Sequence, residues 1–190
     1  GEVEFGFLRV TGNSESESLN AKFNLTREGQ HWRNNYHVEM YGASDDDGRS
    51  AERYFVSTKH DYKLNKNDYL FGYASHEDDR FSGYDSRSVL SAGYGRRWLN
   101  QENMTLDTEI GPGYRIDNPE VGEVEGDAVI RAAIDYIWDI NEGTRFQQKF
   151  SMVAGGSNAE SISTTSLRTQ INQSLSLKVG YEITYNHSVP

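Results

Sequence analysis

An alternation of apolar and polar residues with a period of two runs along most of this chain, and it restricts the fold more than any other feature. In the stretch 32–40, Trp32, Tyr36 and Met40 stand at even positions, and Arg33 and Glu39 stand at odd positions. Successive side chains of a strand point to opposite faces of a sheet, so this pattern predicts strands with one apolar and one polar face. We find no helical periodicity.

The pattern divides the chain into eleven predicted strands, and most of them are long. Their approximate ranges are 2–10, 16–26, 31–42, 52–64, 69–80, 87–98, 104–116, 127–140, 144–155, 161–171 and 174–186. Strands in soluble proteins average roughly 5–6 residues. A strand that crosses a bilayer at about 45° needs roughly 9–11 residues. The segment lengths therefore favour strands that span a membrane.

The predicted connections alternate between two kinds. The short turns are expected at 27–30, 65–68, 99–103, 141–143 and 172–173, and longer polar loops at 11–15, 43–51, 81–86, 117–126 and 156–160. Barrels of the bacterial outer membrane have short turns at the periplasmic rim and longer loops at the outer rim. The alternation therefore favours a membrane barrel over a soluble sandwich.

Aromatic residues gather beside the predicted short turns. We expect them to form a ring at one membrane interface, as aromatic girdles do. The expected members are Trp32, Tyr62, Tyr69, Trp98, Trp138 and Phe146.

These features together predict an all-β fold: a single antiparallel transmembrane β-barrel over residues 1–190, with an up-and-down meander of eleven strands. The alternative is a soluble antiparallel barrel or sandwich, in which the apolar face would point inward. A low mean hydropathy of −0.78 does not exclude the membrane barrel, because the lumen face of such a barrel is polar.

If the apolar face meets lipid, the charged face lines the lumen. The lumen-lining candidates are Arg33, Glu39, Lys59, Asp61, Asp107, Glu109, Arg115, Arg131, Asp135, Arg145, Lys149, Lys178 and Glu182. Acids and bases nearly balance on this face, and most of the surplus behind the net charge of −10 lies in the predicted loops. Two interpretations stay open, namely a plug of paired ions and a water-filled pore lined by separated charges.

Composition and motifs exclude several functions. The chain has no Cys, which removes disulfides, thiol catalysis and Cys-ligated metal centres. No apolar run is long enough for a membrane helix. The acidic charge balance argues against a nucleic-acid partner. Nucleotide-binding and hydrolase fingerprints are absent, and we interpret Gly93 and Gly111 as residues that relieve crowding or allow curvature.

Two acidic clusters are candidates for a metal site or a catalytic site. Asp45–Asp47 with Gly48 is similar to a calcium loop but lacks the distal bidentate Glu, so we expect a solvated loop and no metal. The group from His76 to Asp79 is the best catalytic candidate, and it would be a protease site at the outer rim. We expect these residues to form an acidic rim without catalytic activity. The sequence therefore predicts neither an enzyme nor a bound cofactor.

Several longer motifs point to a family. They are Thr11–Ser14, Ala51–Tyr54, Asp79–Arg87, Gly93–Gly95, Glu109–Arg115 and the closing Val189–Pro190, and Asp79–Arg87 is the most specific. Along essentially its whole length the chain resembles the salt-induced outer-membrane protein family, also called YdiY-like and catalogued as domain of unknown function 481. The resemblance implies a Gram-negative outer-membrane β-barrel made with a signal peptide.

The family pattern continues past Pro190 into a further strand, and single-chain bacterial barrels have even strand numbers. We therefore expect twelve strands when the barrel is complete, with the closing strand missing after residue 190. The expected function is a narrow channel for small polar solutes or an osmotic-stress envelope protein. The alternative is a plugged, partner-binding barrel. Expected partners are outer-membrane lipid and lipopolysaccharide, with an envelope protein as a further candidate.

Overall fold

The chain folds into strands and tight connections. A computed structural model describes residues 2–10, 16–45, 48–79, 84–119, 123–156, 158–171 and 176–188. The strands are β1 (Glu2–Val10), β2 (Ser16–Glu28), β3 (Trp32–Asp45), β4 (Gly48–Lys63), β5 (Asp68–Asp79), β6 (Tyr84–Asn100), β7 (Met104–Pro119), β8 (Glu125–Asn141), β9 (Thr144–Gly155), β10 (Asn158–Gln170) and β11 (Ser176–Ser188). The described residues hold no helix of the length and apolarity needed to cross a membrane.

The strands form one sheet whose order follows the chain from β1 to β11. The strand pairs β1–β2, β2–β3, β3–β4, β8–β9, β9–β10 and β10–β11 run antiparallel. The predicted all-β antiparallel meander is therefore confirmed. Period-two patterning accounts for it, because each strand offers an apolar and a polar face only when it is extended.

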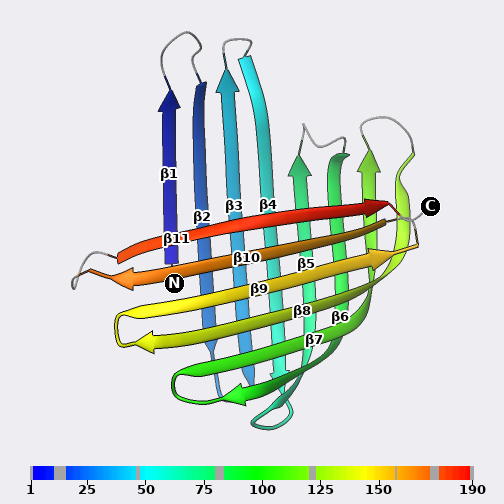
Figure 1. Ribbon diagram of the computed structural model, residues 1–190. Helices are drawn as coiled ribbons and strands as arrows, with labels where there is room; N and C mark the ends of the chain where they lie inside the picture. Colours follow the sequence, from blue (N-terminus) through cyan, green and yellow to red (C-terminus); the bar gives the residue numbers. More distant parts are fainter. Residues whose placement is uncertain are drawn as a thin grey trace. The chain divides into compact units, whose positions relative to one another are not determined.

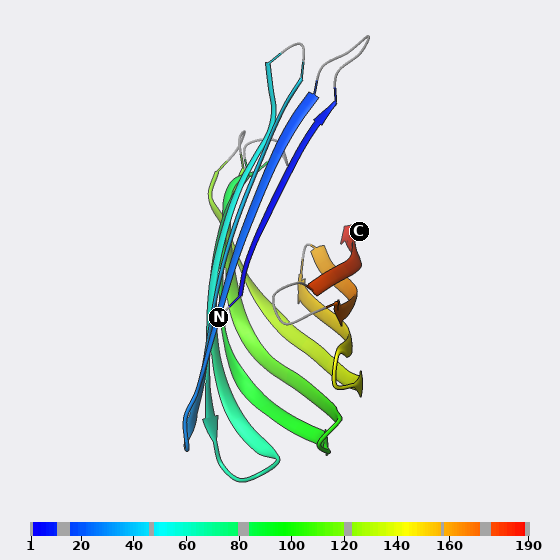
Figure 2. The same cartoon turned by 90° about the vertical axis from the view of Figure 1, so that its left-hand side faces the viewer.

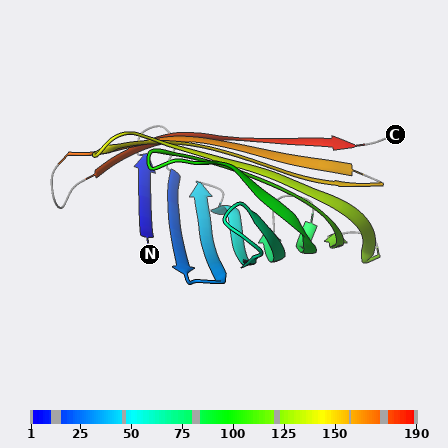
Figure 3. The ribbon, with the colours of Figure 1, turned by 90° about the horizontal axis from the view of Figure 1, so that it is seen from below.

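Two compact units make up the chain, and each is described by itself. The first unit comprises residues 1–62, 72–91 and 114–126, and the second comprises 63–71, 92–113 and 127–190. In the first unit, β1 to β4 pair in sequence and lie side by side (Figures 1 and 3). In the second unit, the longer part of β8 pairs with β9, and β9, β10 and β11 follow in order (Figures 1 and 2).

Two of the long connections contain more strand than the sequence suggested. The predicted loop 43–51 is mostly strand, because β3 continues to Asp45 and β4 begins at Gly48. The predicted loop 156–160 is likewise shortened, since β10 begins at Asn158. The prediction of two clearly different connection lengths was therefore wrong at these two positions. Polar residues there continue the extended backbone because they pair across the hairpin, as Ser44 does with Arg49.

Burial in this chain is the reverse of that in a water-soluble protein. Among the described residues, the buried apolar side chains are Tyr69, Phe71, Val89 and Val129, and the buried polar ones are Glu52, Asp61, Ser91, Glu109, Arg115 and Arg131. Along β7, Glu109 is 8% exposed, whereas the next residue, Ile110, is 58% exposed. The packed interior of the fold therefore lies mostly on the charged face of the strands, and large apolar side chains are exposed on the other face.

Candidate functional site

The candidate site is the charged side of the strands, which we call the polar face. Strand pleating places the predicted lumen-lining residues there. In the first unit this set contains Arg33, Glu39, Lys59, Asp61 and Arg115, and in the second unit it contains Asp107, Glu109, Arg131, Asp135, Arg145, Lys149, Lys178 and Glu182. How these charges are paired and buried decides what the face can do.

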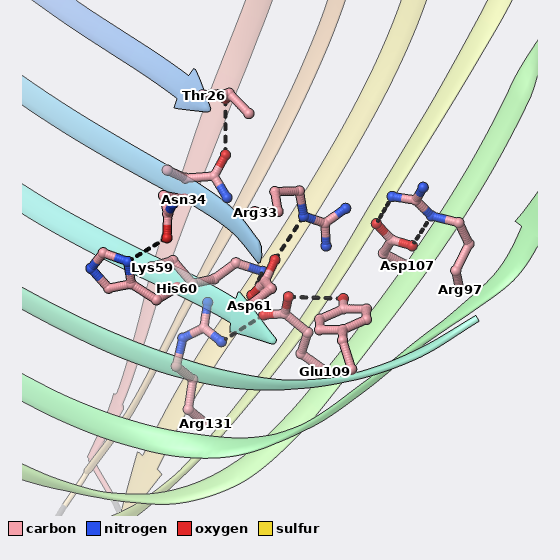
Figure 4. Close-up of polar contacts among 12 residues, drawn as sticks. Thr26, Arg33, Asn34, Lys59, His60, Asp61, Arg97, Asp107, Glu109 and Arg131 are labelled. Carbon is pink, nitrogen blue, oxygen red and sulfur yellow. Dashed lines mark hydrogen bonds and ion pairs between the residues drawn. The ribbon is translucent and has the colours of Figure 1, made fainter. Parts of the chain in front are cut away.

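The Asp61 cluster of the first unit consists of Arg33, Lys59 and Asp61. Arg33 on β3 and Asp61 on β4 are register partners, and the Arg33 Nε donates to Asp61 Oδ2 at 2.7 Å (Figure 4). The Lys59 ammonium lies 3.2 Å from Asp61 Oδ1. Asp61 is completely buried. A buried carboxylate is stable only when cations and hydrogen bonds compensate for its lost hydration, and this cluster supplies both.

The Glu39 cluster lies further along the same two strands. Glu39 on β3 is within ion-pair distance of Lys22 Nζ at 3.1 Å, Arg53 Nη1 at 3.5 Å and His37 Nε2 at 3.5 Å. Arg53 on β4 also donates from Nη2 to Glu77 Oε2 on β5 at 2.7 Å. The carboxylates of Glu39 and Glu77 are thus linked through one guanidinium, and the cluster neutralises its own charge.

Arg115, on β7, is the most deeply buried cation of the first unit that the structure describes. Its side chain is 2% exposed, and its Nε lies 3.0 Å from Asp117 Oδ2. The other oxygen of Asp117 accepts from Arg87 Nε on β6 at 2.7 Å. A single carboxylate therefore joins arginines of two strands.

The Glu109 cluster of the second unit joins three strands through Tyr69, Phe71, Glu109 and Arg131. The Tyr69 hydroxyl on β5 donates to Glu109 Oε1 on β7 at 3.0 Å. Arg131 Nη1 on β8 donates to Glu109 Oε2 at 3.0 Å (Figure 4). The Arg131 guanidinium also lies over the Phe71 ring of β5, 5.3 Å from its centroid, in a cation–π contact. All four side chains are buried.

Glycines on β6 and β7 leave room for the side chains of the Glu109 cluster and let the two strands approach closely. A Cβ added to Gly95 on β6 would overlap the Tyr69 ring. A Cβ on Gly93 would meet the backbone of Ile110 and Gly111, and one on Gly111 would meet the backbone of Ala92 and Gly93. The interpretation of these glycines as residues that relieve crowding agrees with this packing. Tyr69 can reach from β5 to β7 because nothing larger than hydrogen stands at Gly95.

Other predicted polar-face residues of the second unit are also paired. Arg97 on β6 forms two hydrogen bonds with Asp107 on β7, both at 2.8 Å (Figure 4). Asp135 accepts from Gln147 Nε2 at 2.9 Å. Glu182 accepts from Thr164 at 3.2 Å. These contacts are less buried than the Glu109 cluster. Of the three, the Arg97–Asp107 pair balances charge, whereas the partners of Asp135 and Glu182 are neutral.

Arg145 belongs to a row of different composition. Register partners in this row are Asp139 on β8, Arg145 on β9, Arg168 on β10 and Lys178 on β11. Arg145 holds Asp139 through two hydrogen bonds, of 2.6 Å from Nε and 3.0 Å from Nη2. The side chain of Arg145 is 54% exposed, and Arg168 and Lys178 are exposed as well. The four positions of this row thus hold three cations and one carboxylate.

The predicted aromatic ring divides between the two faces. Trp32 and Tyr62 are register partners with ring centroids 5.1 Å apart, and Trp138 faces Phe146 across β8 and β9. Trp98 donates to Thr108 Oγ1 at 2.8 Å and lies beneath the guanidinium of Arg96, 4.9 Å from the ring centroid. These contacts are on the apolar face.

Tyr69 is a correction to that ring. It is 5% exposed and lies on the polar face with Glu109, and Phe71 follows it there. Both residues stand beside apolar Leu70, so the local sequence does not separate the two faces of β5. Glu77 further along the strand has the same parity as Tyr69 and binds Arg53, but Asp78 beside it is also acidic and has the opposite parity. The sequence of β5 therefore carries no clear signal for the face on which Tyr69 and Phe71 lie.

The acidic clusters that were candidates for a metal or catalytic site show little geometry suited to either. His76 Nδ1 forms a hydrogen bond of 2.8 Å with Ser88 Oγ, on the exposed side of β5. Asp79, three residues later on the same strand, belongs to the opposite face, because side chains alternate. Asp46 and Asp47 of the predicted acidic loop lie outside the described residues.

Comparison with known proteins gives consistent matches. The family model described as "Protein of unknown function, DUF481" matches residues 3–190. The Escherichia coli (strain K12) protein described as "Uncharacterized protein YdiY" is 34% identical over 190 residues, which are 100% of this chain and 75% of that protein. Since both matches extend over nearly the whole chain, the protein belongs to the DUF481 family.

Proposed function

We propose that this chain is a β-barrel protein of a Gram-negative outer membrane, and that paired charges fill its interior. In this proposal it is a structural or partner-binding component of the envelope with little or no conductance. The observation that carries the proposal is the inverted burial, in which Asp61, Glu109, Arg115 and Arg131 are buried on one face and large apolar side chains are exposed on the other.

The exposed apolar face supports the membrane location. Leu90 is 66% exposed, Val179 is 62% exposed and Ile110 is 58% exposed. Soluble monomers rarely expose large contiguous apolar patches, because hydration of each patch is unfavourable. Lipid chains would remove that penalty, and strands of 12 to 17 residues such as β5 and β6 are long enough to cross a bilayer.

The pairing on the polar face supports a filled interior. A conducting pore needs charges that face water and can exchange ions. In the Asp61 and Glu109 clusters the carboxylates are buried. Asp61 Oδ2 accepts a hydrogen bond from Arg33, and its Oδ1 lies 3.2 Å from the Lys59 ammonium. Both oxygens of Glu109 accept hydrogen bonds, from Tyr69 and Arg131. Such groups are held by their partners and offer little to a passing solute.

A second candidate is the narrow channel for small polar solutes. One observation favours it, namely the exposed cations of the row that contains Arg145, Arg168 and Lys178. Exposed charge of one sign can select ions in a pore. Conductance measurements separate the two candidates directly.

Partners and activity follow the same proposal. Outer-membrane phospholipid and lipopolysaccharide would contact the apolar face, and an envelope protein could bind at a rim. We propose no enzymatic activity and no cofactor. His76 and Asp79 belong to opposite faces of β5, which disfavours a shared protease site.

Reconstitution of the full-length protein tests the proposal. A band that shifts on a gel with boiling would show a folded barrel, and planar-bilayer recording would then measure conductance. We expect a folded barrel with no unitary steps. Discrete steps, together with a reversal potential that shifts in Arg145→Glu, would favour the channel instead. Lack of a heat-shifted band, together with full recovery in the soluble fraction, would contradict the membrane location.

A variant pair sharpens this test. Replacing both partners of the buried ion pair, in Glu109→Ala with Arg131→Ala, removes bulk and charge from the polar face. Conductance gained in this double variant would show that the cluster blocks an interior path. The control is Asp135→Ala with Gln147→Ala, which removes a more exposed contact of the same face. Equal conductance in the two double variants would count against a specific blocking role for the Glu109 cluster.

A further inference from the structure

We infer that Arg145, Arg168 and Lys178 form a binding site for an oxyanion, with a phosphate group as the best match. The site lies on the polar face of β9, β10 and β11, in the second unit. This inference goes beyond the proposed function and does not depend on it, because a row of cations can bind phosphate in a barrel that conducts or in one that does not.

Register is the first argument. Arg145 is the partner of Arg168, and Arg168 is the partner of Lys178, so three cations stand directly opposite one another on adjacent strands. Like charges at such positions repel each other and destabilise a sheet. An anion that bound between them would turn this repulsion into attraction.

The neighbouring rows show that the arrangement is local. The charged row nearest to it consists of Asp135, Lys149, Thr164 and Glu182, in which the single cation stands beside acids and a hydroxyl. The row between the two contains Ile137, Gln147, Ser166 and Gly180, none of which is charged. Among the described rows of β9 to β11, the three adjacent cations occur in this row only.

Exposure is the second argument. The Arg145 side chain is 54% exposed, whereas Arg131, on β8 of the same unit, is 10% exposed. Arg168 and Lys178 are also exposed. Ser166 and Gly180, in the adjoining row, have small side chains, so bulky groups do not cover the cations from that side. A small anion can therefore reach all three.

The chemistry of the three side chains favours an oxyanion. A guanidinium presents a planar set of N–H donors that matches two oxygens of a phosphate or carboxylate, and an ammonium adds a compact positive charge. The Arg145 guanidinium already shows this geometry with the two oxygens of Asp139. Phosphate suits the row best because its oxygens and double charge can satisfy several cations at once.

Phosphate titration of the full-length protein, refolded in a neutral detergent, tests the site. Inorganic phosphate is the probe, and ³¹P line broadening or calorimetry is the readout. We expect binding that weakens as ionic strength rises. In Arg168→Gln with Lys178→Gln, affinity should fall at least tenfold, whereas Lys149→Gln should stay within twofold of the wild type. A heat-shifted gel band would confirm that each variant folds. If the double variant does not fold, the single variant Lys178→Gln would be used in its place.

Asp139→Asn provides an independent test with the opposite sign. It removes the carboxylate that now engages Arg145, so phosphate affinity should rise several-fold. A fall in affinity in this variant would contradict the proposed use of Arg145. A loss in Lys149→Gln as large as in the row variant would show non-specific attraction and would overturn the site.

A lipid arm identifies the source of the phosphate. The protein is placed in vesicles of phosphatidylcholine with and without phosphatidylglycerol, re-extracted, and assayed for retained phospholipid. Retention that is lost in the row variant but kept in Lys149→Gln assigns the site to a lipid headgroup. Binding of inorganic phosphate without lipid retention assigns it to a free phosphate. Absence of both in the folded wild-type protein overturns the inference.

Discussion

The Glu109 cluster and the cation row of Arg145, Arg168 and Lys178 both consist of charged side chains, but the cluster buries opposite charges together and the row exposes like charges. Both lie on the polar face of the second unit. In the cluster, Glu109 is shared by Arg131 and Tyr69, and every member is buried. In the row, three cations are neighbours in register, and they are exposed. Opposite charges buried together stabilise the fold, and the exposed like charges of the row are the ones that we propose to bind an oxyanion.

The residues beneath the two regions explain the difference. Gly93, Gly95 and Gly111 let Tyr69 and the neighbouring strands approach closely, so the charges of the cluster are covered by their own partners. Gly180 also approaches its neighbour, since a Cβ there would lie 2.8 Å from the Thr165 carbonyl oxygen. Its register partner, however, is the small Ser166, and the cations of the adjoining row stay exposed.

The largest effect should come from breaking the cluster. Glu109→Ala leaves the buried Arg131 without its carboxylate, and an uncompensated buried charge destabilises a protein by about 3–5 kcal/mol. We expect this loss in the free energy of unfolding, measured by urea titration of the protein in detergent. A loss below about 1 kcal/mol would show that Arg131 finds water or another acid, and that the cluster is not a buried unit.

A double variant separates the charge from the packing. In Glu109→Leu with Arg131→Met both charges are removed and similar volume is kept, so much of the stability should return. Equal destabilisation in the double and single variants would mean that shape, and not the unpaired charge, dominates.

Glycine substitution should have the next largest effect. In Gly95→Ala the new methyl group overlaps the Tyr69 ring, which must then move away from Glu109. Overpacking of this kind typically lowers stability by about 1–3 kcal/mol. The matched control is Gly72→Ala on β5, where a Cβ would have nothing within 4 Å. The same urea titration should show a loss for Gly95→Ala only, and equal losses would mean that strand glycines act through backbone freedom alone.

Much of the fold could be predicted from the sequence because one signal repeats in every strand. The period-two pattern located all eleven strands, and it placed Arg33, Asp61, Glu109 and Arg131 on one face. Each strand has several residues that indicate which of its two faces is apolar, so a single ambiguous residue does not change the assignment of the faces.

The errors arose where that signal is weak. Tyr69 and Phe71 are separated by Leu70, so apolar residues occupy both faces of β5 there, and the acids further along, Glu77 and Asp78, also lie on opposite faces. Loop 43–51 was expected to be irregular because it is polar, but hairpin pairing extends its backbone from both ends. Pairing partners could not be predicted either, because they depend on which strands are neighbours and how far a side chain reaches, as Tyr69 does across Gly95.

The Tyr69 hydroxyl makes a smaller contribution that the sequence did not predict. Tyr69→Phe keeps the ring over Gly95 and removes the donor to Glu109 Oε1. A hydrogen bond to a charged group contributes about 1.5–3 kcal/mol, and Glu109 retains Arg131, so we expect a loss near the lower end. The measurement is the same urea titration, and Tyr94→Phe is the comparison, because it removes an exposed hydroxyl that donates to Asp68. Equal losses in the two variants would mean that burial does not strengthen the Glu109 hydrogen bond.

The smallest effect should appear in the cation row, and its sign should be reversed. Arg168→Gln removes a like charge that faces both Arg145 and Lys178, so stability in phosphate-free buffer should rise by about 0.2–1 kcal/mol. Because the row is exposed, this gain should disappear at high ionic strength. Adding phosphate should instead stabilise the wild-type protein and leave the variant almost unchanged, since only a state that binds the ligand gains from it. A variant that is less stable than the wild type in every buffer would place the row with the Glu109 cluster, as a structural set of charges.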